Sequence, residues 1–185
     1  MGLGVTWLDH DEVLEREPEI TPDILGGIFS PKEGYVRGKR YVDSLAQAAT
    51  KLGATCLEGV EVIGLESEGA KVTGVRTHEG IVHADHTILA TGPWTGIAGC
   101  WTEDKLPIKP AKGERILLRK VGFMPNCPIN GFEGYVIPQV DGDLLVAATR
   151  IEDRFDEEVT AGGVSQMVDA AVALFPMLSE ATFVR

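Results

Sequence analysis

The sequence predicts an α+β fold in which an α/β unit is followed by an antiparallel sheet with flanking helices. Residues 38–53 repeat apolar side chains at the spacing of a helix, and residues 87–90 form a short, nearly all-apolar run typical of a buried parallel strand. Beyond Lys109, strand-like segments follow one another across short turns. We therefore expect the architecture to change between Cys100 and Lys109.

The N-terminal segment predicts one short helix and one strand. Met1–Trp7 carries no recognisable element. Asp9 is a suitable N-cap, with acidic residues in the first turn, for a helix that ends before Pro18. Ile24–Phe29 is a strand candidate interrupted by two glycines.

Residues 38–53 give the clearest helical pattern in the chain. One face is apolar and the other polar, and Gly53 supplies the C-terminal stop, so we expect this helix to pack on a sheet. Four strand segments are predicted after it: Thr55–Leu57, Glu61–Ser67, Lys71–Thr77 and Ile81–His83.

The segment from Ala84 to Gly96 is the first candidate for a ligand site. Thr87–Ala90 fits a strand buried on both faces, and Thr91-Gly92-Pro93 ends it abruptly. Open α/β sheets bind ligands beyond the carboxyl ends of such strands. A ligand can approach Gly92 closely, and the Trp94 ring is able to cover a planar group; the alternative is an ordinary sheet edge followed by a turn.

The second half of the chain predicts an antiparallel sheet. Its strands are expected in Gly113–Arg119, Gly134–Pro138 and Asp143–Thr149, with a tight turn at Asp141-Gly142. We expect Leu117, Val136 and Val146 to lie in one sheet. A helix with one apolar face is expected within residues 156–176.

Composition excludes several classes of partner. The chain has 185 residues and a formal net charge of -11, which disfavours binding to nucleic acid or to an anionic membrane. No segment approaches the roughly 20 apolar residues of a membrane span. Cys56, Cys100 and Cys127 are odd in number and widely spaced, so we expect reduced thiols in a cytoplasmic protein and no metal site.

Four short motifs carry a family resemblance: Ala90-Thr91-Gly92-Pro93-Trp94-Thr95, Pro110-x-x-Gly113-Glu114, Tyr135-Val-Ile-Pro138-Gln-x-Asp141-Gly142 and Ala147-Ala148-Thr149. In this order and spacing the chain resembles the FAD-dependent amine oxidoreductases of the glycine oxidase, sarcosine oxidase and D-amino-acid oxidase group. Gln139 stands where the family usually has Arg, and Ala147 where it usually has Gly.

The resemblance implies a division into residues 1–37 as a lead-in with the first substrate-domain elements, 38–99 as a partial FAD-binding domain and 100–185 as a substrate-binding domain. It implies FAD contacts at Val62, Thr91, Gly92 and Trp94, with Val62 beside the adenine.

The resemblance also places three residues at the substrate. Tyr135 is expected to bond a substrate carboxylate through its hydroxyl; the alternative is a strand tyrosine with its ring in the core and its hydroxyl in solvent. Arg150 and Glu133 fall where the family varies its pocket lining, although both also suit exposed charges. If Arg150 faces the flavin, it favours an acidic substrate. No catalytic residue is assigned.

Two family segments have no counterpart in the sequence. The family begins with a Gly-x-Gly-x-x-Gly turn that holds the FAD pyrophosphate, and this chain contains no such turn. The family's Trp-x-Gly-Leu-Arg-Pro segment, whose arginine binds the substrate carboxylate, is also absent. We therefore expect the middle portion of an oxidase of small amines or amino acids, which alone binds FAD weakly and is inactive.

Uncovered apolar surface beside Thr87–Ala90 then predicts a homodimer or a partner that supplies the missing segments. Two other functions stay open. One is a non-catalytic module that binds a small acid or a partner chain, and the other is a D-amino-acid or 2-hydroxyacid dehydrogenase-type flavoenzyme. Bound flavin absorbs visible light, so a spectrum of the purified protein separates the module from both flavoenzymes.

Overall fold

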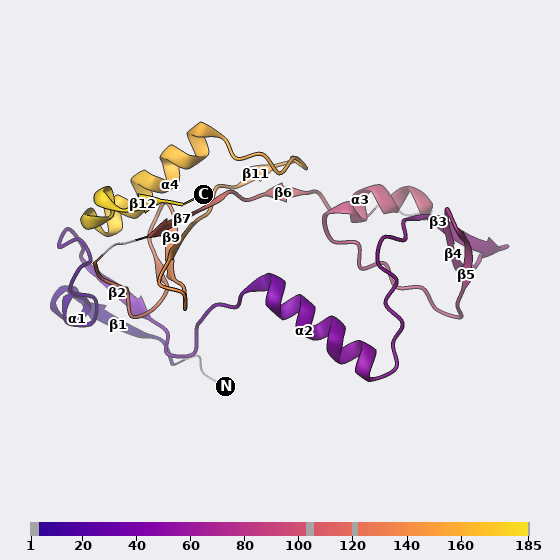
Figure 1. The fold of residues 1–185 in the computed structure, drawn as a ribbon, viewed down its shortest axis with the longest axis horizontal. Helices are drawn as coiled ribbons and strands as arrows, with labels where there is room; N and C mark the ends of the chain where they lie inside the picture. Colours follow the sequence, from indigo (N-terminus) through magenta and orange to yellow (C-terminus); the bar gives the residue numbers. More distant parts are fainter. Residues whose placement is uncertain (1–3, 103–105, 120–121, 185) are drawn as a thin grey trace. The chain divides into compact units, whose positions relative to one another are not determined.

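The computed structural model describes residues 4–102, 106–119 and 122–184. The chain divides into two compact units (Figure 1). The first unit combines residues 1–36 with residues 112–185, and the second comprises residues 37–111.

The first unit is built on a five-stranded antiparallel sheet with the strand order β12-β7-β10-β9-β8. Its strands are β7 (Arg115–Arg119), β8 (Ile129–Asn130), β9 (Tyr135–Pro138), β10 (Leu144–Ala147) and β12 (Thr182–Phe183). In β10, Leu145 pairs with Leu117 and Val146 pairs with Val136. The prediction that Leu117, Val136 and Val146 share one sheet is confirmed. Two further short strands, β6 (Ala111–Lys112) and β11 (Ile151–Glu152), pair with each other.

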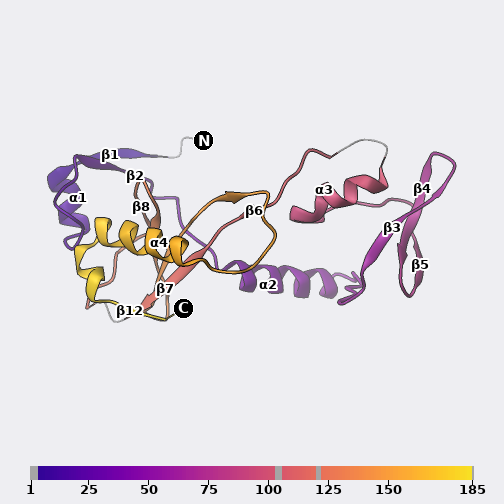
Figure 2. The same ribbon diagram turned by 90° about the horizontal axis from the view of Figure 1, so that it is seen from above.

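Helix α4 (Ala161–Leu174) packs on this sheet through contacts with β7, β9 and β10 (Figure 2). Thr160 caps the start of the helix, and its side chain accepts a hydrogen bond from the Gly163 amide. It is followed by the short 3₁₀ helix Pro176–Glu180. The largest fully buried side chains of the unit belong to one hydrophobic core: Ile116, Val136, Leu144, Val146 and Phe175.

The N-terminal part of the first unit contains β1 (Thr6–Asp9), α1 (His10–Arg16) and β2 (Gly26–Phe29). The predicted cap of α1 is confirmed, because the Glu12 amide donates to Asp9 Oδ1 at 3.0 Å and Glu12 Oε2 accepts from the Asp9 amide at 2.9 Å. The expectation that Met1–Trp7 forms no element was wrong for Thr6 and Trp7. They belong to β1, which pairs antiparallel with β2. This pairing joins distant segments, so a local reading of the sequence does not detect it.

The second unit contains α2 (Gly38–Lys51) and a three-stranded antiparallel meander. The strands are β3 (Val62–Glu68), β4 (Lys71–Thr77) and β5 (Gly80–His83), which confirms the last three of the four predicted strand segments. Short helical turns follow at η1 (Gly92–Trp94), α3 (Thr95–Ala98) and η2 (Gly99–Trp101).

Three predictions for the second unit were wrong. Thr55–Leu57 and Thr87–Ala90 are not strands, and Ile88 is 88% exposed instead of buried. Helix α2 exists where predicted, but its apolar face is not covered by a sheet: it has no buried residue, and Leu45 is exposed.

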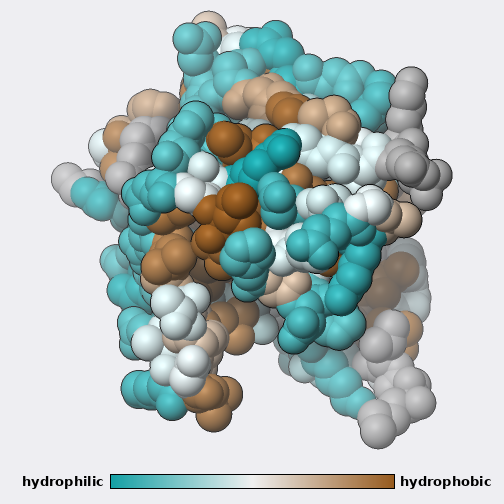
Figure 3. Space-filling view, turned by 90° about the vertical axis from the view of Figure 1, so that its right-hand side faces the viewer, coloured by the Kyte–Doolittle hydropathy of each residue, from teal (hydrophilic) through white to brown (hydrophobic). Residues whose placement is uncertain are grey.

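The physical reason is the same in each case. An apolar pattern shows which face of a segment favours burial, whereas burial itself requires a partner, and among the described residues none pairs with 87–90 as a strand. Figure 3 shows hydrophobic side chains on the molecular surface among the hydrophilic ones.

Candidate substrate pocket and cofactor-contact turn

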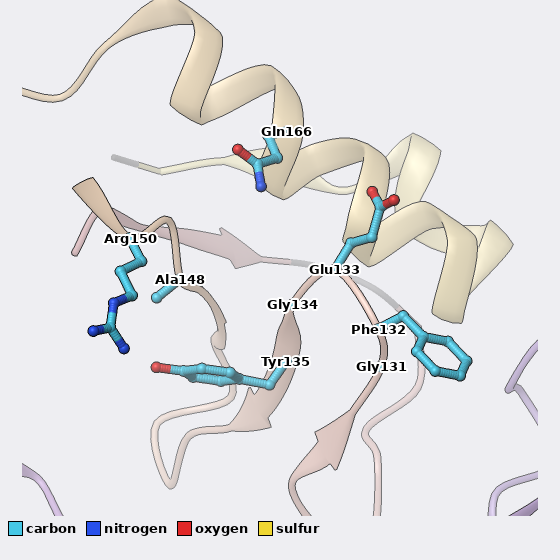
Figure 4. Close-up of a pocket in the computed structure, with 8 residues that line it drawn as sticks. All are labelled: Gly131, Phe132, Glu133, Gly134, Tyr135, Ala148, Arg150 and Gln166. Atoms are coloured by element: carbon cyan, nitrogen blue, oxygen red, sulfur yellow. The ribbon is translucent and has the colours of Figure 1, made fainter. Parts of the chain in front are cut away.

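A pocket of about 670 Å³ lies at one end of the sheet in the first unit (Figure 4). It is formed by the loop before β9, the first residue of β9, the segment after β10 and one side chain of α4. Its lining residues are Gly131, Phe132, Glu133, Gly134, Tyr135, Ala148, Arg150 and Gln166. The structure therefore brings together the three residues expected at the substrate, Tyr135, Arg150 and Glu133.

The sheet register explains why Tyr135 and Arg150 meet. Tyr135 begins β9 and pairs with Ala147 at the end of β10, and the chain reaches Arg150 three residues beyond Ala147. In Figure 4 the Tyr135 hydroxyl and the Arg150 guanidinium extend to the same side of the pocket. They offer a neutral donor and a cation, and each of these can bind an anionic group of a ligand.

Glu133 and Phe132 point elsewhere. The Glu133 carboxylate lies on the side of α4, away from the Tyr135 hydroxyl, and the Phe132 ring is directed outward (Figure 4). Phe132 is fully exposed. The negative charge of Glu133 is therefore separated from the side of the pocket where Tyr135 and Arg150 converge.

Arg150 forms an ion pair with Glu152 at an N–O distance of 3.3 Å. The side chains are 78% and 71% exposed, and ion pairs of such exposure contribute about 0.2–1 kcal/mol. A ligand carboxylate is therefore able to replace Glu152 at small cost. The pair leaves Arg150 available for recognition of an anion.

Several lining residues were not identified from the sequence. Gln166 reaches the pocket only because α4 packs across the sheet, and no local signal marks it. Gly134 carries a weak signal as one of two glycines flanking Phe132 and Glu133. An added Cβ at Gly134 would lie 3.0 Å from the Ala147 carbonyl oxygen and 3.3 Å from the Ala170 Cβ, so a glycine allows the close approach of this loop to β10 and α4.

Three of the residues expected at the cofactor lie in one turn of the second unit. The hydroxyls of Thr91 and Thr95 lie 3.0 Å apart, and Thr95 Oγ1 donates to the Gly92 carbonyl oxygen at 2.7 Å. Gly92 has a φ of 53°, and its Cβ position meets no atom within 4 Å. Trp94 is 58% exposed. The open backbone at Gly92 and the exposed indole fit contact with a flat ring system.

Val62, the fourth residue expected at the cofactor, begins β3 and pairs with Thr77. It is partly buried in the meander. Within the described ranges, no group of His, Cys, Asp and Glu side chains is arranged to hold a metal ion. The helices of those ranges are also too short or too polar to cross a membrane.

The whole chain, residues 1–185, matches the family model described as DAO, FAD dependent oxidoreductase, and the protein belongs to this family. The family resemblance expected from the sequence is thereby confirmed. The chain is 30% identical to the glycine oxidase of Geobacillus kaustophilus over 186 residues, which cover 100% of this chain and 49% of the relative. It is 32% identical to the bifunctional protein ThiO/ThiG of Synechocystis over 179 residues, 94% of this chain and 26% of the relative.

Solved structures agree with this assignment. The crystal structure of the Geobacillus kaustophilus glycine oxidase superposes with a TM-score of 0.92 at 29% identity, covering 100% of this chain and 50% of that one. L-proline dehydrogenase from P. horikoshii shares the fold, with a TM-score of 0.93 at 20% identity over 100% of this chain and 51% of that one. The chain thus spans about half the length of the glycine oxidase that it matches.

Proposed function

We propose that these residues belong to an FAD-dependent enzyme that oxidises a small amine or amino acid, and that the pocket of the first unit holds the substrate. The observation that carries the proposal is the convergence of Tyr135 and Arg150 in one pocket of a chain matched over its whole length by an FAD-dependent family. Relatives named glycine oxidase support a small amino acid as the substrate.

In this proposal the protein orients the substrate and tunes its surroundings. The Tyr135 hydroxyl donates a hydrogen bond to the substrate carboxylate, and Arg150 pairs with an anionic group after releasing Glu152. FAD, when bound, supplies the hydride acceptor for the carbon next to the amine. The Thr91–Gly92 backbone and the Trp94 indole would contact the cofactor, and the backbone at Val62 would contact its adenine.

The oxidase proposal is tested by supplying the other half of the enzyme. A hybrid in which residues 1–185 replace the matching segment of the Geobacillus kaustophilus glycine oxidase is expected to bind FAD. It should also release hydrogen peroxide with glycine, sarcosine or a D-amino acid. The 185-residue chain alone with added FAD serves as the comparison and is expected to be inactive. A yellow hybrid that oxidises none of these amines contradicts the proposal, and saturable turnover by the chain alone contradicts the expectation of inactivity.

A second candidate is oxidation of a 2-hydroxy acid. The Tyr135 hydroxyl recognises a carboxylate in the same way whether the neighbouring carbon carries an amine or a hydroxyl. Adding glycolate and lactate to the substrate panel separates the two candidates. Turnover of hydroxy acids without turnover of amines favours the second.

We also propose that the exposed apolar surface of the second unit is covered by association, either with a second copy or with a chain that supplies further segments. Ile88 and the apolar face of α2 support this proposal. Light scattering at micromolar concentration tests it, and a monomer under these conditions contradicts the homodimer.

A further inference from the structure

Glu114, immediately before β7, has a buried carboxylate that accepts hydrogen bonds from two other parts of the first unit. Its side chain is 1% exposed. Oε1 accepts a hydrogen bond from the Thr160 amide at 2.8 Å, and Oε2 accepts from the Thr149 hydroxyl at 3.1 Å. The side chain therefore joins segments that are 46 and 35 residues away in the sequence.

The bond between Glu114 and Thr149 is reciprocal. The Glu114 amide donates to Thr149 Oγ1 at 3.0 Å, while the same hydroxyl donates to the Glu114 carboxylate. Thr149 stands between Ala148 and Arg150, which both line the pocket. Two hydrogen bonds thus hold the side chain of the residue that precedes Arg150.

The bond between Glu114 and Thr160 secures the other side of the pocket. Thr160 is the N-cap of α4, and its hydroxyl accepts from the Gly163 amide at 3.0 Å. Helix α4 carries Gln166 into the pocket. One carboxylate therefore holds both the segment with Arg150 and the helix with Gln166.

The charge of Glu114 is compensated inside the protein. The Lys112 ammonium, whose side chain is only 6% exposed, lies 3.8 Å from Glu114 Oε1 and also contacts Asp156. A buried carboxylate with several donors and a nearby cation remains ionised. Its two acceptor oxygens are then available for both groups of donors.

The direction of the Arg150 side chain depends on the hydrogen bonds that hold its neighbour Thr149. The long side chain of Arg150 is largely exposed, and its ion-pair partner Glu152 is exposed as well. Because an exposed arginine samples many rotamers, the direction of its guanidinium depends on how firmly its backbone is held.

We propose that Glu114, acting through Thr149, is a positioning residue that sets the preference of the pocket for a second anionic group on the substrate. This inference rests on the proposed role of Tyr135 and Arg150 in substrate binding. When the hydrogen bonds between Glu114 and Thr149 are broken, the chain at Arg150 is held less firmly. Recognition of the second carboxylate then weakens more than recognition of the first.

The experiment measures ligand binding to the 185-residue chain, so it does not depend on oxidation or on FAD. NMR titrations give the dissociation constants of D-aspartate and glycine, and their ratio reports recognition of the second carboxylate. Thr149→Val keeps the side-chain shape but removes the hydroxyl, and is expected to lower the preference for D-aspartate about three- to tenfold. Thr149→Ser keeps the hydroxyl and is expected to retain the preference. Glu114→Gln keeps an acceptor for the Thr160 amide and should shift the ratio in the same direction as Thr149→Val.

The Arg150→Met variant separates the role of Arg150 in binding from the positioning role of Glu114 and Thr149. It is expected to abolish the preference, and Thr149→Val added to it should then have no further effect on the ratio. If Arg150→Met lowers the preference but Thr149→Val does not, the positioning role is wrong while the role of Arg150 stands. If Arg150→Met leaves the ratio of the two dissociation constants unchanged, the role of Arg150 is wrong, and the positioning role of Glu114 is then wrong as well. An equal loss for both ligands in Thr149→Val would indicate a merely structural role and overturn the proposal.

Discussion

Two adjacent glycines in the first turn of α4 provide a sharp test of the packing around Glu114. A Cβ added at Gly163 would lie 1.8 Å from Glu114 Oε2, 2.7 Å from its Cδ and 3.0 Å from Thr160 Oγ1. A Cβ added at Gly162 would meet no atom within 4 Å. Gly163→Ala and Gly162→Ala therefore make the same chemical change in the same helix, once into a filled space and once into an open one.

The expected effects have opposite signs. Alanine in place of glycine favours a helix by up to about 1 kcal/mol, and Gly162→Ala should show this stabilisation. In Gly163→Ala the added methyl displaces a hydrogen-bonded side chain, and overpacking of this kind costs about 1–3 kcal/mol. The helix-propensity gain is common to both variants, so they should differ by roughly 1–3 kcal/mol in the free energy of unfolding.

Urea denaturation of both variants, followed by circular dichroism and by tryptophan fluorescence, measures this difference. The dependence of the unfolding free energy on urea should stay unchanged, which shows that the surface exposed on unfolding is the same. If Gly163→Ala is as stable as Gly162→Ala, the Glu114 carboxylate does not occupy the space beside Gly163. The argument that Glu114 joins Thr149 and Thr160 is then wrong.

Three further predictions address other parts of the first unit. Tyr135→Phe in the hybrid enzyme should raise the KM for glycine about tenfold, because the hydrogen bond to the substrate carboxylate is lost, and an unchanged KM contradicts the role of the hydroxyl. Burial raises the pKa of the Cys127 thiol to about 11, so iodoacetamide at pH 8 should label Cys127 much more slowly than Cys56; equal rates contradict this environment. The hydrogen bond from the Thr160 amide holds the pKa of Glu114 below its ordinary value of 4.5, so its stabilising contribution is present above that pH and is lost as the pH falls through the folded-state pKa. Acid titration of unfolding should show this loss, and Glu114→Gln should make the profile flatter.

The elements predicted from local patterns agree best with the structure. The cap at Asp9, the β3–β4 hairpin and the turn at Asp141-Gly142 each depend on residues close together in sequence. The Gly142 amide, for example, donates to the Gln139 carbonyl oxygen at 3.0 Å. Such signals are readable because the groups that form them are never far apart along the chain.

The pocket residues were predicted by a different route. Nothing in the local pattern around Tyr135 and Arg150 distinguishes a pocket lining from exposed strand residues, and only the family motifs joined them. Their convergence follows from the register of β9 and β10. Gln166 lies outside those motifs and was missed for this reason.

The sequence by itself determined helices α1, α2 and α4, most of the strands and the family, because capping, alternation and motif order are local or sequential properties. The tertiary structure alone decided which apolar faces are buried. The face of α4 is buried against the sheet, whereas the equally regular face of α2 remains exposed in its unit. The tertiary structure also decided that Glu114 joins Thr149 and Thr160, because a hydrogen bond across 35 or 46 residues exists only once the intervening chain has folded.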